Sequence, residues 1–456
     1  MEPKLEKKYG LFTAIAMVVG IVIGSGVFFK AEKILTATGG NLKDGILAWV
    51  IGGIIMISCA YTFSVMATRY QYINGVVDYA EATMGKKYAY YVGWFMAAIY
   101  YPTITSVLAW VSARYTCVIF GFSITGGECM TIACLYLISS FTMNALSPVL
   151  AGKFQVSTTV IKLIPLFLMA VAGTFTGLRN GMTMYNFTHY VSQSTSNGLF
   201  TAVVAASFAY EGWIIATCIN AELNNAKRNL PLALIAGTFI TMSVYILYYI
   251  GLAGTIKNEV MMAGGETGAK LAFQTVFTSA GGSLLFVFVI ISCLGTLNGL
   301  MLGCTRGIYS IAARGLGPKP RVFSQVDPAT NMPVNSAIMG LFLCGIWLFY
   351  FYGANLTASW FGFFSFDSSE LPIITIYALY IPIFIMFMAK GKGLNFFNRI
   401  LMPSISLAGC IFMIAAAWFA HGIAAVGYLI VFFAVMAFGA VLLQKAKLPL
   451  NEVPHK

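Results

Sequence analysis

The sequence predicts an all-α integral membrane protein that crosses the bilayer about twelve times. Of its 456 residues, 59% are hydrophobic and only 9% are charged, whereas a soluble domain carries about 25% charged residues. Apolar runs of about 20 residues, each long enough for one membrane-spanning helix, recur along the chain. A chain this poor in polar groups cannot cover its surface in water. These observations exclude a soluble enzyme, a nucleic-acid-binding domain and a secreted disulfide scaffold.

The apolar runs give the order of the predicted helices. The first run follows a basic tail and is too long and too interrupted by glycine for a cleaved signal peptide, so we expect it to be the uncleaved first span. Taken in order, the runs predict spans at residues 11–30, 44–68, 87–120, 129–149, 155–177, 198–222, 230–256, 275–314, 334–352, 362–389, 400–420 and 422–444.

The distribution of lysine and arginine predicts the orientation of these helices. Twelve spans place both ends of the chain on one side of the membrane. The two tails and the loops on their side carry 18 lysines and arginines, against 6 in the opposite loops. Because positive charge accumulates in cytoplasmic loops, both termini are predicted to be cytoplasmic, in a multi-pass protein of the plasma membrane. The formal charge of +12 therefore does not indicate nucleic-acid binding.

The sequence contains no pattern typical of a metal site or of catalysis. None of its nine cysteines forms a C-x-x-C pair, and most lie in apolar runs, where a thiol is usually a small buried hydrophobe. The three histidines, His189, His421 and His455, fall in a loop, at a helix junction and in the C-terminal tail. A membrane-embedded enzyme would lack its catalytic groups, so we expect no enzyme, no metal and no cofactor.

The first span contains a sequence that disfavours a continuous helix. Gly20, Gly24 and Gly26 fall within seven residues, and each glycine costs a helix about 1 kcal/mol relative to alanine. One interpretation is a close-packing face, since Gly20 and Gly24 have the spacing of small residues at helix contacts. The other is that Gly24-Ser25-Gly26 is unwound and offers backbone N–H groups to a carboxylate at the start of a half-helix.

The sixth span shows a matching interruption. Glu211 and Gly212 lie mid-membrane, within residues 207–213, between two apolar arms. Non-helical backbone at this depth is tolerated where it lines a cavity or packs in protein. Because the interruptions are five spans apart, they predict two inverted repeats with a binding site where the breaks meet. The predicted units are an N-terminal tail (1–10), two five-helix repeats (11–177 and 198–389), two further helices (400–444) and a C-terminal tail (445–456).

Four stretches of the chain carry a family pattern: residues 20–28, residues 208–213 with Glu222 and 229–231, residues 159–165, and residues 292–299 through Arg306. In this order they resemble the amino acid–polyamine–organocation superfamily, in its L-type amino acid transporter branch, which includes bacterial serine/threonine exchangers. The resemblance implies the LeuT-type fold, with helices 1 and 6 unwound. Two motifs depart from it: residues 71–78 replace a Pro-x-x-Gly-Gly-x-Tyr-like turn, and Asn225-Ala226 replaces Asn-Pro.

The resemblance implies a site for an α-amino acid that is built mainly from backbone groups. The N–H groups around Gly24, Ser25 and Gly26 are expected to bind the carboxylate, and the carbonyls of Val22 and Phe208 the ammonium. The hydroxyl of Ser25 adds a further bond or, equally, bonds back to its own helix.

Aromatic and acidic side chains complete the expected site. Phe208 is expected to cover the substrate from outside and Tyr100 to line the pocket, although core packing is the alternative for both, and for Trp213. Ala209 belongs to the same stretch as Phe208. Glu211 is expected to pair with a cationic side chain or to bond a serine or threonine hydroxyl; the alternative is a neutral acid bonded to protein groups.

Lys162, in the fifth span, is the most informative charge. An ammonium at this depth is costly unless it is paired or hydrated, and the alternative is snorkelling to the interface. In similar carriers a lysine at the matching place substitutes for a sodium ion. The resemblance implies that Lys162 joins the broken first helix, at the carbonyl of Gly20 or Ile21, to Ser292 or Thr296 in the eighth span.

Together these observations predict a sodium-independent amino acid exchanger that works by alternating access. Bulky aromatics around the pocket favour small neutral polar L-amino acids; a cationic amino acid exchanger and a proton-coupled symporter are the alternatives. A channel or receptor is more remote, since a pore needs a continuous polar path. Cys129 lies where animal relatives join a glycoprotein subunit, but one cysteine is weak evidence, so we expect no obligate protein partner beyond the lipid bilayer.

Overall fold

The computed structural model describes residues 7, 9–70, 75–191, 197–264, 266–357 and 359–445. Within these ranges the chain is helical and contains only two isolated β-bridges. The predicted tails, 1–10 and 445–456, lie largely outside the described residues, as do residues 71–74 of the motif that departs from the family pattern.

Eleven helical segments in the described ranges are long and apolar enough to cross a membrane. Several contain one turn of wider π-helix. The segments are α3 (Leu42–Arg69), α5–η1–α6 (Lys86–Phe95, Met96–Tyr100, Tyr101–Phe120), α7 (Gly127–Leu146), α8–η2–α9 (Pro148–Leu168, Met169–Gly173, Thr174–Asn180), α11–η3 (Gly198–Tyr210, Trp213–Glu222), α12 (Ala226–Ala253), the Ala280–Ala312 part of α14 (Glu266–Ala312), α16–η4 (Val334–Phe351, Tyr352–Leu356), α17 (Leu371–Lys390), η6–α18 (Phe397–Leu401, Met402–His421) and α19 (Ala424–Lys445). The first part of α14 is separated from the span by a kink at Phe277 and Thr278, whose backbone is not helical.

The first predicted span is divided into two short helices, α1 (Leu11–Val22) and α2 (Gly26–Ala37). Each has 12 residues, which at 1.5 Å per residue span about 18 Å, so neither alone crosses a hydrocarbon core of about 30 Å. Together they form one interrupted span. The order of the predicted spans is therefore recovered, with the first broken as expected.

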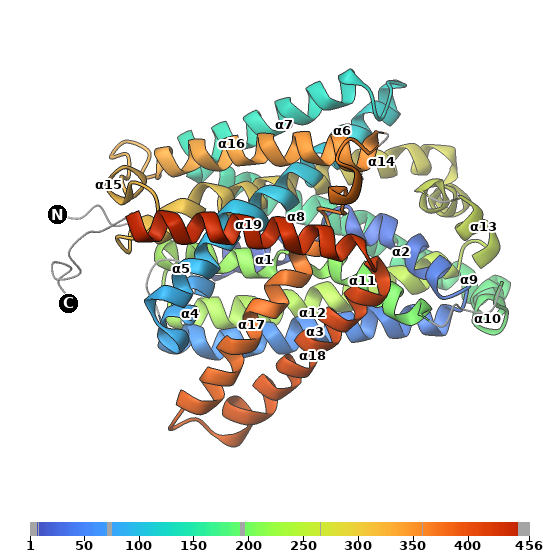
Figure 1. The fold of residues 1–456 in the computed structure, drawn as a ribbon. Helices are drawn as coiled ribbons and strands as arrows, with labels where there is room; N and C mark the ends of the chain where they lie inside the picture. The colour runs from blue at the N-terminus through green and yellow to red at the C-terminus, as the bar shows by residue number, and fades with distance from the viewer. Residues whose placement is uncertain are drawn as a thin grey trace.

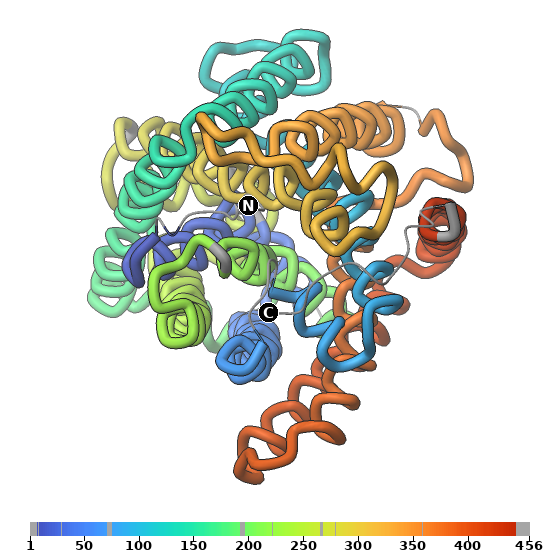
Figure 2. The backbone as a smooth tube through the Cα atoms, turned by 90° about the vertical axis from the view of Figure 1, so that its left-hand side faces the viewer, coloured from blue at the N-terminus to red at the C-terminus, as the bar shows by residue number. Residues whose placement is uncertain are grey.

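Short helices mark the two ends of the molecule. The helices α4 (Gly75–Met84) and α15 (Pro320–Phe323) lie at one end, and α10 (Met182–Thr188) and α13 (Asn258–Gly264) lie at the other (Figure 1). Figure 2 shows α7 and the hairpin of α17 and α18 at opposite edges of the bundle. We refer to the end that carries α10 and α13 as the α13 end.

The tenth span begins later than the sequence predicts. The predicted range was 362–389, but α17 starts at Leu371 and residues 362–364 form the short helix η5. The carboxylate of Asp367 accepts hydrogen bonds from the backbone and the hydroxyl of Ser369, at 2.7 and 2.5 Å. This polar turn interrupts the apolar run. The fifth span begins earlier than the sequence predicts: α8 starts at Pro148, whereas the predicted span starts at residue 155.

Glycines bring the fifth and seventh spans into backbone contact. A Cβ placed on Gly251 of α12 would lie 2.3 Å from the carbonyl oxygen of Met169 in η2. A Cβ placed on Gly254 would lie 2.2 Å from the carbonyl oxygen of Gly173. Small residues at such a contact allow two helices to approach closely without a hydrophobic driving force in lipid. This contact sets the distance between α12 and the helix that carries Lys162.

We expect Gly251→Ala to destabilise the protein, because the added methyl group has no space against the backbone of η2. Overpacking of this kind typically costs about 1–3 kcal/mol, which a lower melting temperature of the detergent-purified protein would report. Gly345→Ala in α16 is the matched control, since a Cβ there meets no atom within 4 Å. Equal melting temperatures for the two variants would contradict the close contact.

Candidate functional site

The break in the first span lies between Val22 and Gly26. Ile23 is extended (φ −74°, ψ 92°), and Ser25 occupies the position before the first residue of α2. The C-terminal carbonyls of α1 and the N-terminal N–H groups of α2 therefore meet at one point. Such ends carry opposite partial charges, negative at the carbonyls and positive at the N–H groups.

The break in the sixth span is formed by Glu211 and Gly212. Glu211 is extended (φ −78°, ψ 159°), and Gly212 has a φ of 104°, a conformation that favours glycine. The chain then continues as the 3-10 helix η3. Glycine is also needed for space, because a Cβ on Gly212 would lie 2.8 Å from the side chain of Ile21.

The two breaks pack directly on each other. A Cβ on Gly26 would lie 2.7 Å from the Cα of Ala209 and 2.9 Å from its Cβ. The start of α2 therefore packs directly against Ala209. The predicted arrangement, with helices 1 and 6 both unwound and adjacent, is confirmed.

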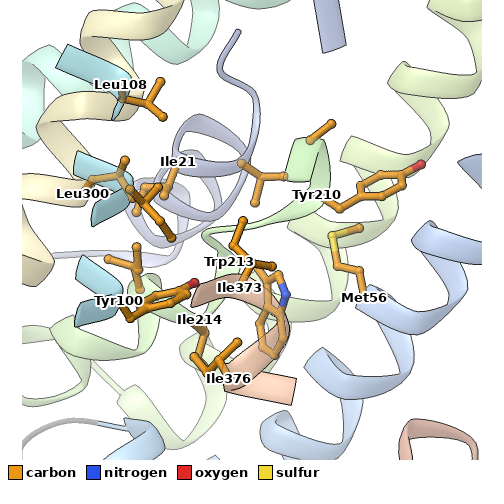
Figure 3. Close-up of a cluster of buried hydrophobic side chains, with 14 of the residues drawn as sticks. Ile21, Met56, Tyr100, Leu108, Tyr210, Trp213, Ile214, Leu300, Ile373 and Ile376 are labelled. Carbon is orange, nitrogen blue, oxygen red and sulfur yellow. The ribbon is translucent and has the colours of Figure 1, made fainter. Parts of the chain in front are cut away.

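A small cavity lies between the breaks. It brings together most of the residues that the sequence predicts for substrate binding. It also has an apolar wall that the sequence does not predict, because an isoleucine or leucine that lines a cavity looks like any other apolar residue of a membrane helix. Figure 3 shows part of this wall, with Leu108 and Leu300 along one side and Ile21 and Ile373 toward the middle. The cavity is lined by Ile21, Val22, Gly24, Ser25, Gly26, Ile104, Leu108, Phe208, Glu211, Thr296, Leu300 and Ile373.

Several backbone carbonyls at the breaks already accept hydrogen bonds from other groups of the protein. The hydroxyl of Tyr245, in α12, lies 3.0 Å from the Val22 carbonyl oxygen and 2.9 Å from that of Ala209. The Phe208 carbonyl accepts a hydrogen bond from the backbone N–H of Glu211 at 3.3 Å. A carbonyl oxygen has two lone pairs, so each of these oxygens retains the capacity to accept a second hydrogen bond. Tyr245 thereby joins both breaks to α12.

Glu211 faces the cavity with one oxygen engaged. Tyr100, which the sequence predicts to line the pocket, is not one of the lining residues; its hydroxyl donates a hydrogen bond to Oε1 of Glu211. The side chain is buried, and among the described residues Oε2 has no hydrogen-bond partner. A buried acceptor of this kind is costly unless it is satisfied. The arrangement therefore presents one unoccupied acceptor beside the cavity.

Lys162 lies beneath the first break, fully buried. Its ammonium donates to the carbonyls of Gly20 and Ile23, at 2.7 and 2.6 Å, and to the hydroxyl of Thr296 in α14, at 3.2 Å. The side chain does not snorkel. The carbonyl of Ile23 takes the place that the sequence analysis gave to Ile21, because the extended conformation of Ile23 turns its carbonyl out of the α1 helix.

Two hydroxyls of α14 complete this contact. The hydroxyl of Ser292 lies 3.3 Å from the Ile23 carbonyl oxygen and 3.2 Å from that of Gly24. The hydroxyl of Thr296 lies within 3.1 Å of the Gly20 and Ile23 carbonyls. Ser292 therefore bonds the broken helix itself rather than Lys162. The first break is held by one ammonium and two hydroxyls.

A buried ion pair joins the eighth span to the end of the sixth. The guanidinium of Arg306, in α14, donates to Glu222 at the end of η3, at 2.8 and 2.5 Å. The backbone N–H of Tyr9, just before α1, donates to the Glu222 carbonyl at 3.1 Å. The sixth span, the eighth span and the segment that precedes the first are thereby joined. The pair was not predicted, although both residues lie in stretches that carry the family pattern.

Two broken helices that meet over a small cavity at bilayer depth define a secondary transporter of the LeuT-type fold. In line with this, the structure is similar to a crystal structure of MhsT in complex with L-phenylalanine, with a TM-score of 0.58 and 13% sequence identity over 94% of this chain and 99% of that one. The chain belongs to the amino acid permease family, whose model matches residues 9–442. It is a multi-pass membrane transporter and not an enzyme.

Three relatives of known function align with this chain over 66% to 91% of their own lengths. The serine/threonine exchanger SteT of Bacillus subtilis (strain 168) is 28% identical over 420 residues, covering 90% of this chain and 91% of its own. The human b(0,+)-type amino acid transporter 1 is 26% identical, over 76% of this chain and 75% of its own. The human cystine/glutamate transporter is 21% identical, over 74% of this chain and 66% of its own.

We expect Gly26→Val to abolish amino acid transport without loss of the folded protein. The added side chain would collide with the backbone of Ala209 and crowd the start of α2. Uptake of labelled amino acid, normalised to the amount of protein in the membrane, measures the effect. Gly127→Val, at the first residue of α7, is the control, because a Cβ there meets no atom within 4 Å. Full uptake by Gly26→Val would mean that substrate does not bind between the breaks.

Proposed function

We infer that the protein is a sodium-independent exchanger of small neutral polar L-amino acids, working by alternating access. The observation that carries this proposal is the contact of Lys162 with the carbonyls of Gly20 and Ile23 and with Thr296. A fixed positive charge already satisfies these oxygen atoms, so a bound sodium ion is not needed to hold the broken helix against α14. The names of the relatives, which include a serine/threonine exchanger, support the same assignment.

The proposed binding mode uses backbone groups for the common part of the substrate. The carboxylate lies at the N-terminus of α2, where the N–H groups of Ser25 and Gly26 and the helix dipole favour an anion. The ammonium lies at the carbonyls of Val22 and Phe208. Because backbone donors and acceptors serve both charges, a zwitterion can be bound in a cavity where Glu211 is the one ionisable side chain among the described lining residues.

The substrate class is inferred from Glu211 and from the apolar residues that line the same cavity. One carboxylate oxygen is taken by Tyr100 and one is open, which fits a single donor such as the hydroxyl of serine or threonine. A guanidinium or ammonium side chain needs several acceptors, and Ile104, Leu108 and Leu300 supply none. This contrast supports a neutral polar substrate over a cationic one, although the cationic exchanger and the proton-coupled symporter are the alternatives that the tests below separate.

We further propose that both termini are cytoplasmic and that the protein works in the plasma membrane without an obligate protein partner. The excess of lysine and arginine on one side supports this orientation. Cys129, the residue nearest to a subunit-linking position, is buried, which supports the absence of a covalent partner.

The two five-helix repeats, residues 11–177 and 198–389, are proposed as the units that carry the two breaks.

Exchange into proteoliposomes tests the function. We expect saturable uptake of labelled serine only when the vesicles contain amino acid, and no change when choline replaces sodium. Lys162→Ala should reduce uptake at least tenfold, since it leaves carbonyls unpaired in a buried site, whereas Lys153→Ala, exposed on the same helix, should not. Strict dependence on sodium would refute the role of Lys162. Uptake into empty vesicles would indicate a uniporter or symporter, and current without saturation a channel.

Glu211→Gln is expected to change the ranking of substrates. The amide replaces the open acceptor by a donor or disturbs the bond with Tyr100, so a hydroxylated substrate should lose about 1–3 kcal/mol of binding, or roughly 5- to 150-fold in affinity, while leucine loses little. Competition of serine, leucine and lysine against labelled substrate measures this ranking. If lysine competes best in the unmodified protein, the cationic alternative is correct. If the variant keeps the original ranking, Glu211 has only a structural role.

A further inference from the structure

Two cysteines meet in the hairpin that α6 and α7 form. Cys117 lies in the last turn of α6, and Cys129 is the third residue of α7. Gly121, in a left-handed conformation (φ 72°), ends α6 and turns the chain toward α7. Both cysteines are fully buried, and their thiols are close enough to interact with each other. The hairpin therefore brings together two sulfur atoms that no part of the substrate site uses.

The packing of the two helices explains why these thiols meet. The helix α6 packs along α7, and in such an antiparallel pair a step of four residues back along one helix matches a step of four forward along the other. Ala113 and Ala133 lie one such step deeper than the cysteines, and both are fully buried. Small residues allow two helices to approach closely. A disulfide requires such an approach, since its two Cα atoms lie only about 4.4–6.8 Å apart.

The cysteine pair lies at the α13 end of the molecule. Figure 1 shows the turn between α6 and α7 at the end that carries α13. Three crossings separate the start of the chain from this turn, namely the broken first span, α3 and the segment that ends with α6. With the N-terminus in the cytoplasm, as proposed above, the turn faces the opposite compartment. Thiols on that side are exposed to oxidising conditions during folding, whereas the cytosol keeps thiols reduced.

We propose that Cys117 and Cys129 form a disulfide within the chain, on the non-cytoplasmic side of the membrane. The proposal rests on the orientation inferred above. As the Sγ–Sγ bond forms, the two thiols together give up two protons and two electrons. A disulfide-bearing thiol oxidant of that compartment accepts them and becomes a dithiol. The bond forms while the hairpin assembles, and the packed helices then shield it from reductants.

The disulfide fastens a helix of the substrate site to its neighbour. The helix α6 carries Ile104 and Leu108, which line the cavity, and the bond holds the end of this helix against α7. The bond also consumes the thiol of Cys129, the residue nearest to a subunit-linking position. A covalent link to another subunit through Cys129 is thereby excluded while the disulfide is intact.

A second pair of thiols shows that contact alone is not the criterion. The sulfur atoms of Cys304 and Cys344 lie 3.5 Å apart, and both residues are buried. Cys304 lies in the last third of the eighth span, Ala280–Ala312, far from the α13 end, where that span begins. No oxidant of the outer compartment reaches this position. We therefore expect Cys304 and Cys344 to remain thiols.

Peptide mapping tests the disulfide directly. Cells are lysed in denaturing detergent with N-ethylmaleimide, which blocks every free thiol, and the purified protein is digested with and without dithiothreitol. We expect a linked pair of peptides containing Cys117 and Cys129 that is present only without dithiothreitol, whereas Cys304 and Cys344 should carry N-ethylmaleimide. N-Ethylmaleimide on both Cys117 and Cys129 would overturn the proposal. A link between Cys304 and Cys344 in place of the expected one would do the same.

Reduction should lower the melting temperature of the detergent-purified protein, because the cross-link no longer restricts the unfolded chain. We expect dithiothreitol, present throughout the melt, to lower it by a few degrees in the unmodified protein and to have no effect on the Cys117→Ser/Cys129→Ser variant. Cys134→Ser is the matched control, since Cys134 lies on α7 but is exposed, and it should keep the sensitivity to reductant. An equal effect of dithiothreitol on the unmodified protein and the double variant would count against the disulfide.

A labelling experiment separates failure of the disulfide from failure of the orientation. In the double serine variant, Ser123→Cys places a thiol in the exposed turn between α6 and α7, and Lys153→Cys places one near the start of α8, where the side chain is also exposed. A membrane-impermeant maleimide added to intact cells should modify the first and not the second. This result together with unlinked Cys117 and Cys129 would overturn the disulfide and leave the orientation standing. Modification of Lys153→Cys alone would refute the orientation and the disulfide that depends on it.

Discussion

Backbone polar groups cannot remain unpaired at bilayer depth, and this constraint organises the whole molecule. The chain interrupts its helices twice where no water is at hand, so every N–H and carbonyl released by the breaks needs a partner. Lys162, Ser292 and Thr296 supply partners for the first break, and Tyr245 joins carbonyls of both. The groups that remain available are concentrated around one cavity. A binding site results because the fold satisfies most, but not all, of the groups that it exposes.

Close packing is the second condition for this arrangement. The breaks meet because Gly26 has no side chain to hold it away from Ala209, and because Gly212 adopts a conformation that glycine tolerates beside Ile21. Glycines 251 and 254 similarly bring α12 against the fifth span. Lys162 and Tyr245, which belong to those two spans, both contact carbonyls of the first break. In lipid, where helices gain little from burying apolar surface against each other, such contacts determine which helices touch.

Two buried ion pairs join elements that are distant in the sequence. Arg306 and Glu222 join α14 to the end of η3, and Lys30 and Glu370 join α2 to the residue that precedes α17. A buried pair gives little net stability, because desolvation offsets the attraction of the charges, but separating it is costly while it remains buried. Pairs of this kind are therefore suited to elements that must be closed in one state and hydrated in another.

Local sequence determined the number and order of the spans, the places where two of them break and the depth of Lys162. These features depend on runs of apolar residues, on glycine and on a single charge in an apolar helix, all of which can be read within one segment. The start of the tenth span was misplaced because an aromatic loop before Leu371 is as apolar as a helix. Only the tertiary structure decided which oxygen atoms Lys162 binds, that Ile104, Leu108 and Leu300 line the same cavity as Glu211, and that Lys30 faces Glu370. Such pairings join residues hundreds of positions apart, and their partners are set by helix packing and by the direction in which an extended residue such as Ile23 turns its carbonyl.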